Sequence, residues 1–415
     1  MSSVLIHSLK GLVLGHPRRV SGKNMADLPQ LGEGAFLLIE DGLIRKTGLQ
    51  NERPERADLI IDGSDRFALP GWVDSHTHLV FAGSREAEFV DRINGLSYQE
   101  IASRGGGILN SAARLAEMSE EALLRDARIR LNEVIRSGTG AIEIKSGYGL
   151  STESELKILR VIRQLKAESP IPIRATFLGA HSVPATYKAN REGYIRLIEE
   201  EMLPAIAAEG LAEYMDVFCE KVAFSVAETQ RLIEAGYKAG LKPKIHVNQF
   251  YSMGGIPMAC SCNAISVDHL EVISNEDIEA LQHSNTIATL LPSAPFFLND
   301  PYPNARALLD AGLAVALATD YNPGSTPSGR MGFVLSLACL KMKMLPAEAI
   351  NAATINGAAA LEWEDELGSI HPGKRANILL TEKIPSLDYL PYRFGSDQLS
   401  EVLVGGKLFP LSQKG

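Results

Sequence analysis

The sequence predicts an α/β fold, a (β/α)8 TIM barrel with a small β-sandwich domain formed from both chain termini. Eight short apolar runs alternate with amphipathic helical stretches in the middle of the chain, which is typical of parallel α/β architecture. Together they span about 250 residues, the usual length of such a barrel. Both ends are instead rich in β signals. We therefore expect residues 1–68 and 369–415 to form the small domain and residues 69–368 to form the barrel.

The eight predicted barrel strands are mostly continuous apolar runs, as expected for strands buried on both faces of a parallel sheet. In chain order they are Trp72–His78, Ala141–Lys145, Ile173–His181, Tyr214–Glu220, Lys244–Gln249, Ile265–Glu271, Ile287–Pro292 and Ala314–Asp320. Helix starts are predicted between them at two capping-box spacings, Thr152-x-x-Glu155 and Ser225-x-x-Glu228. A doubly wound open sheet fits the same alternation, so periodicity favours the barrel without excluding that sheet.

The two ends of the chain predict strands of the small domain. Residues 36–47 are expected to form two strands joined by an Asp-Gly turn, which is a hairpin signal. Residues 368–381 and 402–409 have the same β character. Because β-rich segments stand on both sides of the barrel, we expect the termini to meet in one domain.

The connection between the first two barrel strands, from His78 to Ala141, is unusually long and contains a glycine run at 105–107. Long loops of this kind in barrels are usually functional, so we expect a lid over the mouth. A phosphate cradle is disfavoured because the run follows no strand and lacks the P-loop lysine pattern.

Composition excludes several classes of protein. The 415 residues carry a formal net charge of −9, the opposite of the basic balance typical of nucleic-acid binding. No apolar run reaches the roughly eighteen residues of a membrane span, and no secretion signal is recognisable at the N-terminus. Four cysteines are too few for a disulfide framework. We expect a soluble, cytoplasmic protein with a large core and with no nucleic-acid and no membrane partner.

The strongest chemical signal is Asp74-Ser-His-Thr-His78 at the end of the first predicted strand. Residues two apart on a strand point to the same side, so His76 and His78 direct their rings into one space. Neutral imidazoles in pairs are natural ligands of zinc or iron. Further candidates fall at or near other strand ends, where barrel active sites lie; these are His181, His246, His269 and Asp320.

These motifs resemble the metal-dependent amidohydrolase superfamily, over essentially the whole chain. The matching features are LPGWVDSHTH at 69–78, the histidines of the fifth and sixth strands, and Ala-Thr-Asp ending at Asp320. Four further motifs resemble the family within it that opens 4-imidazolone-5-propanoate to N-formimino-L-glutamate in histidine degradation; these are Phe81–Arg85, Lys145–Gly149, Gly179–His181 and Thr319–Ser325.

The resemblance implies one metal ion per subunit, zinc or iron, held by His76, His78, His246 and Asp320. Zinc lowers the pKa of bound water to about 7, so a hydroxide would attack the ring carbonyl. Asp320 would orient the nucleophile and accept its proton. His269 would polarise the carbonyl or move the proton to the leaving ring nitrogen.

The resemblance also implies which residues bind the substrate. Arg85 would pair with the propanoate carboxylate, for which its planar fork is suited. Gln249 would contact the ring as a neutral group, and because some relatives carry a glutamate there, proton transfer falls here to His269 and Asp320. The remaining substrate-binding candidates are Tyr148, His181, Asn322, Gly324 and Ser325.

Several alternatives remain open at this stage. The first is a deaminase acting on a purine-like or triazine ring, which would use the same metal site. The second is a non-catalytic scaffold, which is disfavoured because such a protein would be expected to lose metal ligands and all four are present here. Lys221, just past the fourth strand, leaves a second metal possible, whereas Lys145 is expected to be structural. Cys260-x-Cys262 lacks the second cysteine pair of a typical metal site. Relatives are commonly dimers, so we expect a homodimer.

Overall fold

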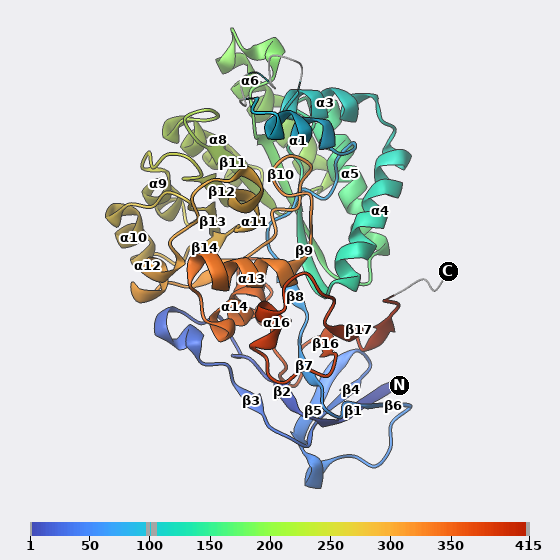
Figure 1. Ribbon diagram of the computed structural model, residues 1–415. Coiled ribbons are helices and arrows are strands. Elements are labelled where there is room, and N and C mark those ends of the chain that lie inside the picture. Colours follow the sequence, from blue (N-terminus) through green and yellow to red (C-terminus); the bar gives the residue numbers. More distant parts are fainter. Residues whose placement is uncertain (1, 97–99, 101–105, 412–415) are drawn as a thin grey trace.

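A barrel and a two-sheet β domain make up the computed structural model, which describes residues 2–96, 100 and 106–411 (Figure 1). All eight predicted barrel strands are present, with shorter bounds in most cases. They are β8 Trp72–Asp74, β9 Thr139–Lys145, β10 Ile173–Ala180, β11 Tyr214–Cys219, β12 Lys242–Val247, β13 Ser266–His269, β14 Ile287–Leu290 and β15 Val315–Leu317.

The barrel strands are parallel and follow one another in sequence order around the sheet. Beyond the ends of β8 and β15, a parallel bridge joins Thr77 to Tyr321. Two backbone hydrogen bonds extend it, from Asp320 N to His76 O at 3.0 Å and from His78 N to Tyr321 O at 2.9 Å. The first and last strands are therefore linked, and the barrel prediction is confirmed over the open sheet.

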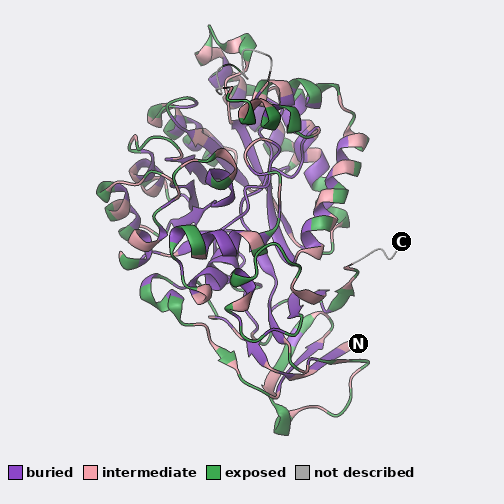
Figure 2. Cartoon of the chain, viewed as in Figure 1, coloured by how far each residue is buried: buried purple, intermediate pink, exposed green. Residues whose placement is uncertain are grey.

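Helices surround the barrel strands (Figure 1). Their bounds are α1 Glu86–Ile93, α3 Ile108–Glu117, α4 Glu120–Arg136, α5 Thr152–Glu168, α6 Arg191–Leu197, α7 Leu203–Glu209, α8 Val226–Lys238, α9 Gly255–Ser261, α10 Asn275–Gln282, α11 Ser293–Leu298, α12 Ala305–Asp310, α13 Met331–Met342, α14 Pro346–Ala353, α15 Ile355–Ala359 and α16 Tyr389–Tyr392. Buried residues concentrate on the strands and on the helix faces turned toward them (Figure 2). No helix in the described ranges is long and apolar enough to cross a membrane.

One of the two predicted capping boxes is correct. Ser225 and Glu228 exchange side-chain and backbone hydrogen bonds at the start of α8. The prediction at Thr152 is wrong, because Ser151 is the residue that caps α5, by accepting from Ser154 N. Glu155 instead turns away from the cap and accepts hydrogen bonds from the backbone of the preceding loop.

The two small-domain sheets have the strand orders β5-β4-β1-β6 and β18-β17-β16-β7-β2-β3. The bounds are β1 Ser3–Leu9, β2 Gly11–Val13, β3 Gln30–Leu31, β4 Ala35–Glu40, β5 Leu43–Leu49, β6 Leu59–Asp62, β7 Phe67–Pro70, β16 Ile378–Thr381, β17 Leu399–Val404 and β18 Lys407–Phe409. The predicted hairpin is β4–β5, whose turn residues Asp41 and Gly42 have φ angles of 50° and 81°. Left-handed conformations at both positions are typical of the tight hairpin turn that Asp-Gly favours.

Both chain ends contribute to the small domain, as predicted. Antiparallel pairing of Leu69 in β7 with Leu379 in β16 joins the N-terminal and C-terminal segments in one sheet. A single buried apolar cluster contains Ile6 and Leu37 from one sheet and Ile378 and Leu403 from the other. The two sheets therefore pack face to face as a sandwich. The boundaries at residues 68 and 369 stay a prediction.

The described part of the expected lid region contains helices. α1, α3 and α4 lie in the connection between β8 and β9. Arg104 and Gly105, at the centre of the expected lid, lie outside the described residues. Gly107 precedes α3 with a φ of 80°, and its N–H donates to the buried Glu88 carboxylate at 2.8 Å. Whether this connection acts as a lid stays a prediction.

Candidate active site

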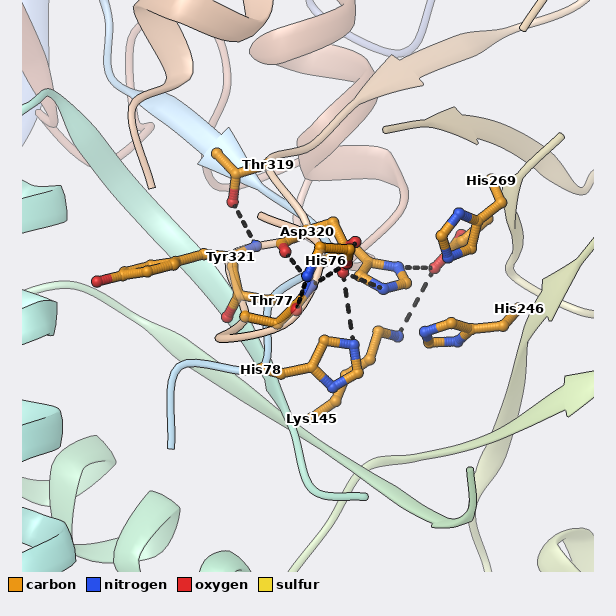
Figure 3. A network of polar contacts seen from close by, with 12 residues as sticks. His76, Thr77, His78, Lys145, His246, His269, Thr319, Asp320 and Tyr321 are labelled. Atoms are coloured by element: carbon orange, nitrogen blue, oxygen red, sulfur yellow. Dashed lines mark hydrogen bonds and ion pairs between the residues drawn. The ribbon is translucent and has the colours of Figure 1, made fainter. Parts of the chain in front are cut away.

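The four predicted metal ligands and His269 come together at the C-terminal ends of the barrel strands (Figure 3). His76 and His78 follow β8, and Asp320 lies three residues after β15, on the segment that pairs with them. His246 is in β12 and His269 ends β13. All five side chains are buried. This clustering is what the strand-end argument predicts.

The four predicted metal ligands surround one small space. Oδ1 of Asp320 lies 3.6 Å from Nε2 of both His76 and His78. The ring centres of His76 and His246 are 4.4 Å apart. Nε2 of His76 is buried and has no hydrogen-bond partner among the described residues. Because an unpartnered buried polar atom is costly, this arrangement fits a cation better than an empty site.

Ligand atoms close enough for one ion form two overlapping sets in the described residues. One set contains His76, His78 and Asp320, and the other contains His76, His246 and His269. In each set the candidate atoms lie within 4.8 Å of one another. The cluster is therefore able to bind a metal. Lys221 is exposed and its ammonium lies 5.0 Å from the centre of the Tyr251 ring, whereas the side chains of this cluster are buried.

Two buried aspartates orient two of the predicted histidine ligands. Nδ1–H of His76 donates to Asp268 at 2.7 Å, and Nδ1–H of His246 donates to Asp216 at 2.7 Å. Such partners fix the tautomer and leave Nε2 for a metal. Sequence reasoning missed both aspartates. The available signal was a carboxylate in the middle of each predicted buried strand, where an unpaired charge is costly.

Lys145 lies at the centre of this network (Figure 3). Its ammonium is 2.8 Å from Asp216, 2.9 Å from Glu143 and 3.6 Å from Asp268, and all four side chains are fully buried. Burial by itself lowers the pKa of Lys145, but the three carboxylates outweigh it and raise the pKa above its ordinary value. A permanently charged lysine suits the expected structural role and not that of a nucleophile.

The histidines separate into two electrostatic classes. Burial holds the pKa values of His76, His78 and His246 well below their usual range, and Lys145 adds to this. Neutral imidazoles are the form that binds metal. His269 differs because, although burial lowers its pKa, the Glu271 carboxylate at 3.3 Å together with Asp320 and Asp268 outweighs this and raises the pKa to about 9.

Asp320 is held on both sides of its carboxylate. Ser325 Oγ donates to Oδ2 at 3.1 Å, while Oδ1 faces the two histidines of the 76–78 motif. Burial raises the pKa of Asp320 to about 6, partly opposed by the charge of His269. A bound cation would lower that pKa and favour the carboxylate form.

Arg85, Tyr148 and His181 form one edge of the site. The rings of Tyr148 and His181 are 5.4 Å apart, and His181 stacks on His78 at 5.4 Å. The Arg85 guanidinium lies 5.7 Å from the Tyr148 ring centre, and its Nε donates to Ser111 at 2.8 Å. Nη2 of Arg85 is buried without a hydrogen-bond partner in the described residues.

The loop after β15 brings Gly324 against Arg85. A Cβ atom at Gly324 would lie 2.5 Å from Nη1 of Arg85, so only glycine allows this approach. Oδ1 of Asn322 accepts the N–H groups of Gly324 and Ser325 at 2.7 and 2.8 Å. Its amide nitrogen donates to Asp320 O and Ser325 Oγ, both at 2.7 Å. Asn322 therefore shapes this loop, and the substrate-binding roles of all three residues stay predictions.

Gln249 is the predicted site residue with the least contact to the others. It is half-buried on the loop after β12. Among the described residues, no hydrogen bond or ring contact connects it to the histidines. Glu220 holds its loop by accepting the N–H groups of Phe250 and Tyr251 at 2.9 and 3.2 Å.

The chain is similar to known proteins over nearly its whole length. A profile described as "Amidohydrolase family" matches residues 67–409. An imidazolonepropionase of Flavobacterium johnsoniae is 57% identical over 391 residues, covering 94% of this chain and 95% of that protein. One of Christiangramia forsetii is 54% identical, with the same coverage. A triazine hydrolase variant of known structure has a TM-score of 0.76 at 17% identity, covering 98% of this chain and 94% of the other, and supports the fold alone.

Proposed function

The chain belongs to the amidohydrolase family and, within it, to the imidazolonepropionases, and from this premise we propose that it hydrolyses 4-imidazolone-5-propanoate to N-formimino-L-glutamate. Membership makes the protein a hydrolase, and the scaffold alternative is not favoured. The observation that carries the site assignment is the unpartnered Nε2 of His76, which faces Asp320 together with His78.

His76, His78, His246 and Asp320 are the residues that would hold the metal, zinc or iron. Three imidazole nitrogens and one carboxylate oxygen suit either ion. When bound, the cation supplies Lewis-acid chemistry, acidifying the attacking water and stabilising charge on the carbonyl oxygen. We assign His269 to proton transfer and not to the ligand set, because its pKa is raised, whereas the pKa values of the other three histidines are lowered.

The reaction adds one water across the ring amide. The carbonyl carbon bonds to the water oxygen, its bond to the ring nitrogen breaks, that nitrogen gains one proton, and the new carboxylic acid ionises. Asp320 accepts a proton from the attacking water, with Ser325 holding its second oxygen in place. His269 delivers a proton to the leaving nitrogen. Asp320 and His269 thus divide the proton transfer between them.

Arg85 binds the propanoate carboxylate in this proposal. Its unpartnered, buried Nη2 calls for an acceptor, and a carboxylate is the acceptor that a guanidinium binds best. A neutral purine-like or triazine ring would leave that nitrogen without a partner, so this contact argues against the deaminase alternative. The homodimer and the cytoplasmic location stay predictions.

The test is the ultraviolet loss of 4-imidazolone-5-propanoate with purified protein, before and after chelation and after metal is added back. We expect metal-dependent loss with formiminoglutamate as product. Fully metallated protein that leaves this substrate intact would refute the proposal and redirect the search to other cyclic amides.

A further inference from the structure

The chain turns sharply where β13 reaches the site. His269 and Leu270 have φ angles of 95° and 62°, in the left-handed region that residues with side chains rarely adopt. Backbone strain of this kind persists only where the surroundings enforce it, and it clusters at functional sites. The turn places the side chain of the next residue, Glu271, beside His269.

Glu271 is a buried carboxylate with only one oxygen bound. Its side chain is 4% exposed. Oε1 lies 3.3 Å from Nδ1 of His269, whereas Oε2 is buried with no hydrogen-bond partner among the described residues. Its charge reaches Asp320 and contributes to the raised pKa of that carboxyl. A buried carboxylate oxygen requires a donor, and the protein supplies none in the described part of the chain.

The proposed reaction needs a carboxylate at this place. His269 can deliver a proton to the leaving nitrogen only if its ring is held with one nitrogen toward the substrate. A carboxylate on the opposite nitrogen is the usual device for this, as in catalytic triads. The amide of Gln249 cannot exchange a proton, so no acid or base is available from that loop position.

We propose, on the basis of the proposed function, that Glu271 completes the active site. Oε1 holds His269 through Nδ1–H, so that Nε2 faces the leaving nitrogen. Oε2 accepts an N–H of the imidazolone ring and so helps to orient the substrate. Glu271 is thus a positioning residue through His269 and a specificity residue through its direct contact with the ring.

The test compares Glu271→Ala and Glu271→Gln with the control Glu276→Gln, which changes an exposed glutamate in the first turn of α10. We expect kcat/KM for the imidazolone to fall at least 100-fold in Glu271→Ala and at least 10-fold in Glu271→Gln. Metal content should remain that of the wild type, and the control should differ by less than twofold.

A second readout needs no substrate. In protein labelled with 15N-histidine, the Nδ1–H signal of His269, identified by its absence in His269→Asn, should be lost in Glu271→Ala. Retention of that signal, or activity of both Glu271 variants within threefold of wild type, would overturn the inference. Loss of metal together with activity would also overturn it, by making Glu271 a structural support. Wild-type protein without activity toward the substrate would instead refute the proposed function, and the Nδ1–H signal would still decide the contact.

Discussion

Replacing Arg85 with methionine should weaken substrate binding without disturbing the metal cluster. Methionine keeps an apolar stem but removes Nη2, which is buried and unpartnered, and Nε, which binds Ser111. Loss of a buried, charge-assisted pair with a carboxylate costs about 2–4 kcal/mol. At 1.4 kcal/mol per factor of ten, kcat/KM should fall by about 30- to 700-fold, mostly through a higher KM.

The assay is the initial rate of ultraviolet loss at varied substrate concentration, with a control variant and a control substrate. Arg114→Met removes an exposed guanidinium that donates to Ser84 O, and should leave KM unchanged. On an imidazolone without the propanoate tail, wild type and Arg85→Met should react equally. An unchanged KM for the full substrate in Arg85→Met, or an equal loss on both substrates, would refute the carboxylate contact.

Three further predictions concern the site and its supports. Asp320→Asn should keep the fold, checked by circular dichroism, but lower kcat by about 10³-fold or more because a proton acceptor is lost; near-normal turnover would contradict that role. Lys145→Met should lower the free energy of unfolding in urea by about 3–5 kcal/mol, since it leaves Asp216 and Asp268 buried without their cation; an unchanged midpoint would argue against the network. Burial lowers the pKa of His181 to about 4, so the unfolded chain binds more protons between pH 6.5 and 4. His181 should therefore lower stability as pH drops through that window, by at most about 3 kcal/mol, and His181→Asn should reduce the dependence of the urea midpoint on pH; an unchanged dependence would contradict this.

The barrel could be predicted from the sequence because its strands are buried on both faces. Strands of this kind appear in the sequence as continuous apolar runs. The same runs overestimated strand length at the mouth. At His269 and Asp320 the backbone adopts positive φ angles, so the strands end there although the predicted site residues extend to these positions. Strand-end histidines could be placed from sequence because parallel strands bring their C-terminal ends to one side.

Residues whose role depends on hydrogen-bond partners outside their own motif could not be placed in this way. Thr152-x-x-Glu155 has the spacing of a cap, yet Glu155 satisfies the N–H groups of Gly147, Gly149 and Leu150 in the loop that carries Tyr148. Here the capping bond competes with the hydrogen bonds to these buried N–H groups. Leaving buried N–H groups without an acceptor costs more free energy than losing the capping bond. Spacing alone contains no information about that competitor.

The support of the metal ligands shows how far such long-range constraints extend. His76 and His246 belong to different strands, and each depends on its own aspartate, but one ammonium, that of Lys145, contacts both aspartates. The orientations of these two predicted ligands are thereby tied to a single side chain that is not itself in the predicted ligand set. A sequence shows Lys145 only as a charge at the end of an apolar strand. Its partners lie 71 and 123 positions along the chain from it, and the barrel fold brings both Asp216 and Asp268 within 4 Å of the Lys145 ammonium.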